Sequence, residues 1–93
     1  MSDTVRQNTQ LNRFELDVGG QMAVANYRFE GDIIAFTHTE VPPEMRGRGI
    51  ASRLVAEALQ LARGKGLKVR ARCDFVATYL AKHPEYNDLV APR

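Results

Sequence analysis

The hydrophobic pattern changes from a two-residue to a helical period across one short turn, and this change constrains the fold more than any other feature. Residues 33–41 alternate as a strand does, a Pro-Pro pair prevents its continuation, and an Arg-Gly-Arg-Gly segment follows at 46–49. From Gly49 onward apolar residues recur at spacings of three and four, which predicts a helix that ends near Gly64. The turn therefore joins a strand directly to the start of a long helix.

Before this turn the chain predicts an antiparallel meander of three strands. Residues 13–18 and 22–30 alternate in hydrophobicity, and a Gly-Gly pair between them is typical of a hairpin turn. A Gly-Asp pair makes the next tight turn, which leads into the strand at 33–41. Residues 1–10 are polar, and we expect them to form a disordered tail.

After the long helix we expect a fourth strand and a second helix. Residues 67–73 alternate again, and residues 74–83 fit a short helix that is capped by Asp74 and ends before a proline. The third strand, the long helix and the fourth strand form a βαβ unit, whose crossover should be right-handed and whose strands should be parallel. The sequence therefore predicts one α+β domain over residues 1–93, with the element order β-β-β-α-β-α.

Length and composition narrow the class of protein. A chain of 93 residues with 44% hydrophobic and 26% charged residues is typical of one small globular domain. No apolar run is long enough to cross a bilayer, so we expect no membrane partner. The lone cysteine, Cys73, has neither a disulfide partner nor metal-ligand spacing, which indicates a cytoplasmic setting without a bound metal. A small core and an edge strand fit a monomer or a weak homodimer.

One half of the chain is locally basic. Residues 46–72 contain eight Lys or Arg and a single acidic residue, Glu57. Such a segment could contact nucleic acid, bind the phosphates of a small cofactor, or simply face solvent. Aromatic residues for base stacking are not interspersed among these charges, so a nucleic-acid partner is disfavoured. The other two interpretations stay open at this point.

The Arg-Gly-Arg-Gly turn has the composition of a phosphate-binding site. The first amides of a helix lack internal partners and its dipole is positive there. Gly47 and Gly49 remove the Cβ atoms that would keep a phosphate away, and Arg46 and Arg48 add positive charge. A Walker-type loop would need Gly-Lys-Ser/Thr, which is absent, and a dinucleotide-binding loop would need glycine at Ser52. The alternative is that the glycines only make a tight turn and the arginines are solvated.

The same residues carry a resemblance to a known family. RGRGIA is similar to the acetyl-CoA signature Q/R-x-x-G-x-G/A of the GNAT superfamily of N-acetyltransferases, with Arg46, Gly49 and Ala51 at its defined positions. HTEVPPEMRGRGIASRLV, the following RC pair and HPEY resemble the small YjdJ-type single-domain N-acetyltransferases over about residues 13–90. The resemblance implies a minimal GNAT-like fold, without the N-terminal helices and last strands that usually shape the acceptor site. Asp74 departs from it, because relatives often have proline there.

The resemblance also implies a co-substrate and the residues that hold it. The chain should bind acetyl-CoA and transfer its acetyl group to a primary amine of unknown identity, either a small molecule or a protein. The pyrophosphate would lie on amides of the turn, and the pantetheine arm in the gap between the two parallel strands. The residues expected to bind it are Thr39, Val41, Arg46, Gly47, Arg48, Gly49, Ile50 and Ala51. A module that binds or senses acyl-CoA without catalysis is the alternative.

Four side chains are candidates for the chemistry. His38 and Glu40 share one face of the predicted strand near its end, where either could accept the amine proton, although both could also be structural. The resemblance implies that Tyr79 protonates the leaving sulfur, and core packing is its alternative role. Cys73 could carry the acetyl group as a covalent intermediate. It lies on the apolar face of its predicted strand, however, so we expect a buried cysteine and direct transfer.

Overall fold

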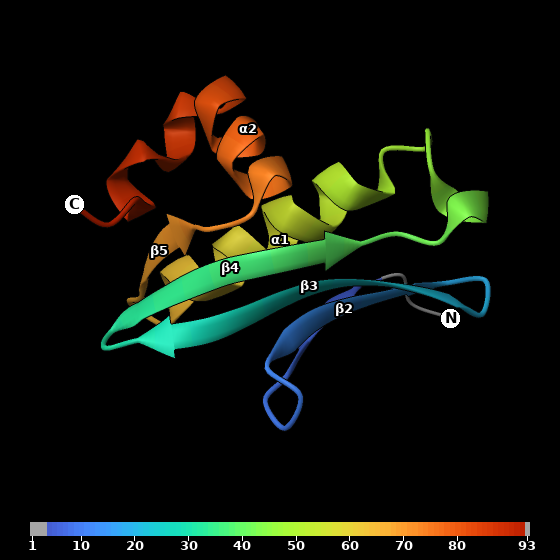
Figure 1. The fold of residues 1–93 in the computed structure, drawn as a ribbon, viewed down its shortest axis with the longest axis horizontal. Coiled ribbons are helices and arrows are strands. Elements are labelled where there is room, and N and C mark those ends of the chain that lie inside the picture. The colour runs from blue at the N-terminus through green and yellow to red at the C-terminus, as the bar shows by residue number, and fades with distance from the viewer. Residues whose placement is uncertain (1–3, 93) are drawn as a thin grey trace.

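The computed structural model describes residues 4–92, in which a mixed five-stranded sheet packs helices against one face (Figure 1). The strands lie in sequence order, with β1 to β4 antiparallel and β5 parallel to β4. The meander, the βαβ unit and the α+β class are therefore confirmed. The elements are β1 (Val5–Asn8), β2 (Arg13–Val18), β3 (Gln21–Glu30), β4 (Ile33–Glu40), the 3-10 helix η1 (Pro43–Met45), α1 (Ile50–Gly64), β5 (Lys68–Ala71), α2 (Asp74–Lys82) and the 3-10 helix η2 (Pro84–Leu89).

The N-terminal strand β1 lies where the sequence predicts a disordered tail, so that expectation is wrong for residues 5–8. β1 pairs antiparallel with β2, from Val5 opposite Leu16 to Asn8 opposite Arg13. Its first amide, that of Val5, donates to the Glu57 carboxylate of α1 at 3.2 Å. This polar strand forms through its pairing with the next strand, β2, and its contact with α1, because its own residues show little hydrophobic alternation. Residues 1–3 lie outside the described residues.

The junction between β5 and α2 also differs from the prediction. Strand pairing ends at Ala71, and Cys73 is the N-cap residue of α2 instead of a strand residue. Asp74 is the first residue of the helix and makes no capping hydrogen bond, so its predicted role as the cap is wrong. Its carboxylate still lies in the first turn, where the helix dipole favours negative charge.

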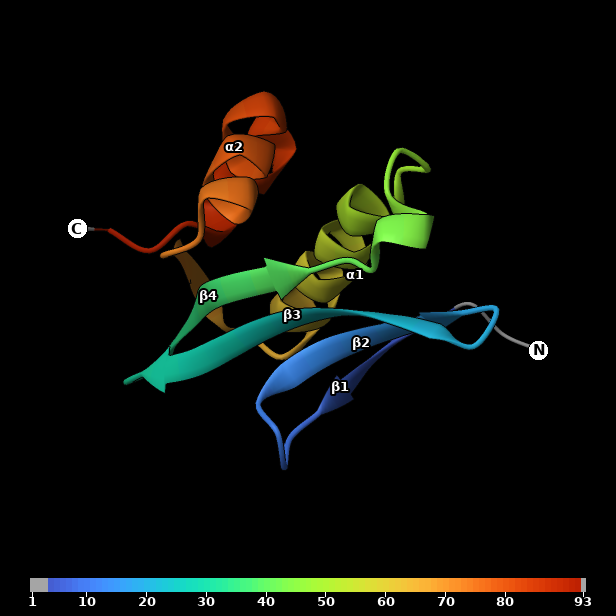
Figure 2. The same ribbon diagram turned by 45° about the vertical axis from the view of Figure 1, so that its right-hand side comes forward.

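The hydrophobic core lies between the sheet and α1, and both long helices are on the same side of the sheet (Figure 2). Aromatic rings from three strands contact one another there: the ring centroid of Phe14 is 5.3 Å from that of Tyr27, in a tilted arrangement, and 5.8 Å from that of Phe36, in a stacked one. Burial of an amphipathic face, more than intrinsic propensity, stabilises a helix of this length. The buried residues of α1 are Ile50, Leu54, Val55, Ala58, Leu59 and Ala62.

A β-bulge in β4 shifts the alternation of side chains near the end of that strand. Tyr27 of β3 pairs with Phe36, whereas the preceding residue, Asn26, pairs with His38. Thr37 is therefore an extra residue without a partner of its own in β3. Because Phe36 faces the core, plain alternation would have directed His38 toward the helices as well.

The bulge exchanges the two faces of β4 beyond it. Thr39 pairs with Ala25, which belongs to the core, so Thr39 faces the helices. His38 and Glu40 face the opposite side of the sheet, where both are exposed. The predicted shared face of His38 and Glu40 is present, on the side of the sheet away from the helices.

On that opposite side a buried carboxylate links the first two strands. Glu15 is only 2% exposed and accepts hydrogen bonds from Arg13 at 2.7 Å and from Arg6 and Asn8, each at 3.0 Å. Burial by itself would raise the pKa of Glu15. The hydrogen bonds from Arg13 and Asn8 and the charges of Arg13 and Arg6 outweigh it, so the pKa lies below its ordinary value.

Replacing this carboxylate should change the acid stability of the fold. Glu15→Gln should lower the free energy of unfolding at neutral pH by about 1–3 kcal/mol, because the two guanidinium groups lose their partner. A carboxyl whose pKa is lowered by folding stabilises the protein above its unfolded pKa, and this contribution is lost as the pH falls through the folded pKa. Urea denaturation between pH 7 and pH 3 should therefore show that the two proteins become similar in stability at low pH. Glu44→Gln, at an exposed carboxylate, is the control, and an equal loss in both variants would contradict the prediction.

Candidate functional site

The turn before α1 exposes a set of backbone amides with no helical partner. Gly47 and Gly49 have φ angles of 79° and 73°, a left-handed conformation that residues with a Cβ rarely adopt. Gly49 is the N-cap residue of α1, and no side chain caps the helix. The first i→i−4 bond joins the Arg53 amide to the Gly49 carbonyl, so the amides of Ile50 to Ser52 precede the helical ladder.

The space next to both glycines is open. A Cβ built at Gly47 or Gly49 meets no atom within 4 Å, and both residues line the same cavity. Open space, free amides and the positive end of a helix dipole together form a cradle for an anion. Such an arrangement is typical of phosphate-binding sites.

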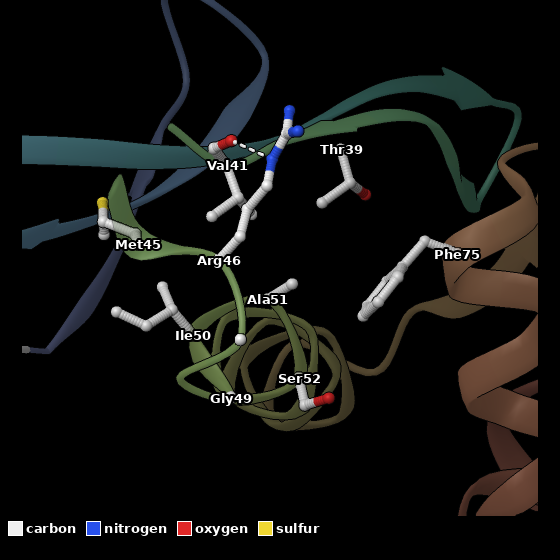
Figure 3. A pocket seen from close by; sticks show the side chains of 10 residues that line it. Thr39, Val41, Met45, Arg46, Gly49, Ile50, Ala51, Ser52 and Phe75 are labelled. Atoms are coloured by element: carbon white, nitrogen blue, oxygen red, sulfur yellow. Dashed lines mark hydrogen bonds between the residues drawn. The ribbon is translucent and has the colours of Figure 1, made fainter. Parts of the chain in front are cut away.

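The cavity of about 390 Å³ next to the turn brings together three parts of the chain (Figure 3). Thr39 and Val41 come from the end of β4 and the residue after it, and Phe75 comes from the first turn of α2. Figure 3 shows the Phe75 side chain directed toward the start of α1. The volume falls within the usual range for small-molecule sites. The remaining lining residues are Met45, Arg46, Gly47, Gly49, Ile50, Ala51 and Ser52.

This cavity opens at the point where β4 and β5 separate. Their pairing ends at Phe36 opposite Ala71, followed by one last hydrogen bond from the Arg72 amide to the Phe36 carbonyl at 2.9 Å. Beyond that bond β4 has no strand partner on this side among residues 4–92. Thr39 Oγ1 and Cys73 Sγ lie 3.5 Å apart across the opening. An extended ligand could therefore reach from the turn into the gap between the strands.

A second cavity adjoins the first and lies toward the opposite face of the sheet. It contains His38 and Glu40, whose Nε2 and Oε2 atoms are 3.2 Å apart. Arg46 belongs to both cavities, and its Nε donates to the Val41 carbonyl at 3.2 Å. The other lining residues are Met22, Thr39, Val41 and Pro42. Two groups that can accept a proton thus lie in the cavity that adjoins the first one.

Three of the predicted site residues do not line either cavity. Arg48 is exposed and contacts neither, and it forms no hydrogen bond or ion pair with another residue of the range 4–92. Cys73 is half-buried beside Thr39 and packs against the core. Tyr79 lies one turn further along α2 than Phe75 and stacks on His83, with 4.0 Å between ring centroids.

The ionisation of Tyr79 follows from its surroundings. Burial raises the pKa of its hydroxyl, and the nearby Tyr86 and Glu85 raise it further. The hydroxyl therefore stays protonated at neutral pH and is able to donate a hydrogen bond or a proton. The rings of His83 and Tyr86 pack beside it in the C-terminal segment.

Three residues of the first cavity are absent from the predicted set. Met45 is buried beneath the turn, Ser52 is the third residue of α1, and Phe75 reaches over from α2. Ser52 could have been found from its place in the first helical turn. Met45 and Phe75 carry no comparable signal, because an apolar residue near a strand end is more commonly part of the core.

The basic segment of the chain is largely used in internal pairs. Arg53 pairs with Glu57 at 3.0 Å and Arg63 with Asp88 at 2.6 Å. Arg70 and Arg72 both bind Glu30. Four of the eight basic residues of this segment therefore have acidic partners within the described chain.

Within residues 4–92 no group of three or more His, Cys, Asp or Glu side chains is arranged to hold a metal ion. No helix of the described chain has the length and apolar character needed to span a bilayer.

Comparison with known proteins agrees with the geometry of the cradle. The GCN5-related N-acetyl-transferase family matches residues 13–89. The chain is 34% identical to Protein NATD1 of Mus musculus over 95% of its own length and 84% of that protein, and 32% identical to Protein NATD1 of Homo sapiens over 95% and 82%. Its fold matches the NMR structure of a GCN5-like protein from Staphylococcus aureus with a TM-score of 0.74 and 28% identity, over 100% of this chain and 93% of that one. The chain therefore belongs to the GCN5-related N-acetyltransferase family.

Proposed function

We propose that this protein transfers the acetyl group of acetyl-CoA to a primary amine. The observation that carries the proposal is the open cradle at Gly47 and Gly49, which combines free amides, a helix N-terminus and room for a phosphate in one place. Family membership supports the same reaction class. In this proposal the amides of the turn bind the pyrophosphate, and Arg46 and Arg48 add charge around it. The pantetheine arm would extend past Thr39 into the gap between β4 and β5.

The chemistry requires an amine nucleophile and the departure of a thiol. The amine nitrogen attacks the thioester carbonyl, the new C–N bond forms, and the C–S bond breaks once the tetrahedral intermediate collapses. The amine must lose a proton and the thiolate must gain one. In the proposed site the carbonyl lies near the backbone of Val41, at the boundary of the two cavities.

The adjoining cavity supports a role for His38 and Glu40 in proton removal. Both side chains are exposed, 61% and 66% respectively, and each lies within hydrogen-bonding distance of the other. Either could accept the amine proton directly or through a water molecule. The pair would also attract a cationic amine to the cavity before transfer.

Tyr79 and Cys73 receive different roles in this proposal. Tyr79 has a protonated hydroxyl, which suits an acid for the leaving thiolate, but it does not line the first cavity and would act through a relay or after a shift of α2. Cys73 contributes packing and a contact to Thr39 beside the thioester. Direct attack needs no covalent intermediate on this thiol. A reducing cytoplasm fits the single cysteine of the chain.

A binding module without catalysis is the second candidate. It is favoured by the shallow, exposed setting of His38 and Glu40, since many catalytic acids and bases lie in more enclosed sites. Such a module would bind acetyl-CoA and leave it intact with any amine present. Release of free CoA thiol in the presence of amines separates the two functions. Neither of these two functions involves binding of nucleic acid by the locally basic segment.

The cradle can be tested with one glycine pair. Gly49→Ala should reduce the affinity for CoA and acetyl-CoA by about tenfold or more, because the added methyl fills space that the phosphate needs. Gly66→Ala is a matched control, because Gly66 has φ 72° and the same open surroundings at the far end of α1. Isothermal titration calorimetry measures the affinity of each folded variant for CoA and acetyl-CoA. Unchanged affinity in Gly49→Ala, or an equal loss in Gly66→Ala, would exclude the cradle.

The proton acceptors can be separated from the cofactor site. Glu40→Gln or His38→Ala should lower kcat by ~10–100-fold and shift the acid limb of the pH–rate profile, with CoA affinity nearly unchanged. Rates are followed by thiol release and CoA affinity by calorimetry. Full activity of both single variants and of the double variant would show that neither residue takes the proton.

The role of Cys73 can be tested by removing its sulfur. Cys73→Ala should keep a substantial fraction of turnover and lose about 1 kcal/mol of stability, because a half-buried sulfur contact is lost. Intact-mass spectrometry after mixing the wild-type protein with acetyl-CoA alone should show no acetyl adduct that later discharges to an amine. A folded but inactive Cys73→Ala, together with such an adduct on Cys73, would instead establish a covalent mechanism.

A further inference from the structure

The sheet face opposite the helices is not covered by any element of residues 4–92 (Figure 2). Because cross-strand partners share a face, the strand register places the residues of this uncovered face in rows. Two of these rows end at the proton acceptors of the second cavity, Glu40 and His38. One row is Arg6, Glu15, Val24 and Glu40; the next is Asn8, Arg13, Asn26 and His38; a third is Arg28, Ala35 and Arg70.

Two well-exposed arginine side chains lie on this uncovered face. Arg6 is 58% exposed and Arg28 62% exposed, while the carboxylate that each one binds lies underneath with 3% and 20% exposure. Ala35 in the third row is fully buried although no helix covers it. The aliphatic stems of arginine can cover such residues and keep their guanidinium groups in water.

A second, partly buried carboxylate on this face, that of Glu30, also binds arginines. Glu30 accepts hydrogen bonds from Arg72, Arg70 and Arg28, and the pKa of Glu30 is lowered to about 2 by those from Arg72 and Arg70 above all. Each guanidinium has five N–H donors, and the carboxylate below takes only part of them. The outward donors remain available to an acidic partner.

Negative charge is exposed on this uncovered face next to the second cavity. Glu40 is 66% exposed beside His38, and half-buried Asp17 pairs with Met22, which lines the same cavity. The exposed face therefore has one acidic site where the amine would enter and arginines further along the sheet. The acidic site is complementary to a cationic group of a partner, and the arginines are complementary to anionic groups around that cation.

The shape of the second cavity also restricts its acceptor. Its walls come only from β3, β4 and the segment up to Arg46, and no described element closes it from outside. Sites for small molecules usually bury most of the ligand surface in a concave pocket. An open sheet face can instead meet the surface of another protein.

We propose, on the basis of the function proposed above, that the acceptor is a lysine side chain on the surface of another protein, flanked there by Asp and Glu residues. Glu40 attracts the lysine ammonium to the cavity, and the flanking carboxylates bind the guanidinium groups of Arg6 and Arg28. Arginine suits this role because its planar fork pairs with two carboxylate oxygens at once.

The test compares acceptors that differ only in their surroundings. Short N-acetylated peptides carry one central lysine flanked by Asp and Glu, by Asn and Gln, or by Arg, and Nα-acetyl-lysine amide represents the isolated amine. We expect kcat/KM to be highest for the acidic peptide, by about tenfold over the neutral one, and lowest for the Arg-flanked peptide. The ratio of kcat/KM for the acidic peptide to that for the neutral peptide should decrease as salt is raised from 20 to ~300 mM, because exposed charges are screened.

A surface variant links this preference to the uncovered face. Arg28→Glu should lower kcat/KM for the acidic peptide by about threefold or more and leave that for Nα-acetyl-lysine amide unchanged. Lys82→Glu makes the same change of charge on α2, on the helix side, and should have little effect on either acceptor. Arg28→Gln serves as a milder variant if the reversal disturbs the contacts of Glu30.

The possible failures have distinct meanings. Equal kcat/KM for all four acceptors, or a preference that Arg28→Glu and Arg28→Gln both leave intact, would overturn the acidic-protein acceptor while the acetyltransferase function stands. A preference for Nα-acetyl-lysine amide over every peptide would also overturn it. If acetyl-CoA binds but no amine is acetylated, the transfer function itself fails, and the inference fails with it.

Discussion

The site depends on one constraint in the sheet, namely that β4 has two strand partners at its start and only one at its end. β3 accompanies β4 to Glu40, but β5 leaves it after Phe36. The buried row formed by Ile34 and Val69 fixes the parallel pairing, and the short loop from Arg72 to Asp74 then turns the chain into α2. A parallel strand cannot follow further once its chain has entered a helix. The resulting gap is the opening of the first cavity.

The anion cradle depends on the same strand from its other side. The chain leaves β4 at Glu40, passes η1 with Met45 anchored in the core, and returns to start α1 over the sheet. Burial of the apolar face of α1 fixes the direction of the helix, so its free amides are directed to the end of β4. The free amides and the strand gap are thus held by one packing arrangement.

The two faces of the sheet are shielded from solvent by different kinds of side chains. One face is covered by helices around Phe14 and Phe36, and the other carries arginines that bind Glu15 and Glu30. The carboxylates fix the positions of these arginines, because each carboxylate binds arginines from different strands. This solution leaves the second face accessible next to His38 and Glu40.

The sequence alone determined the class of the fold and the location of the cradle. Local rules suffice there: alternation defines the strands, the glycine pairs define the turns, and helical spacing after Gly49 defines α1. Other features depended on tertiary structure. The polar strand β1 forms because it pairs with β2. Strand β5 ends two residues before its predicted end, and the Arg72 amide makes the last hydrogen bond to β4. The bulge at Thr37, which no hydrophobic pattern marks, sets which side chains face each cavity. The direction of the side chains after such an insertion is set by the pairing of β4 with β3. This register cannot be predicted from the local sequence pattern of β4.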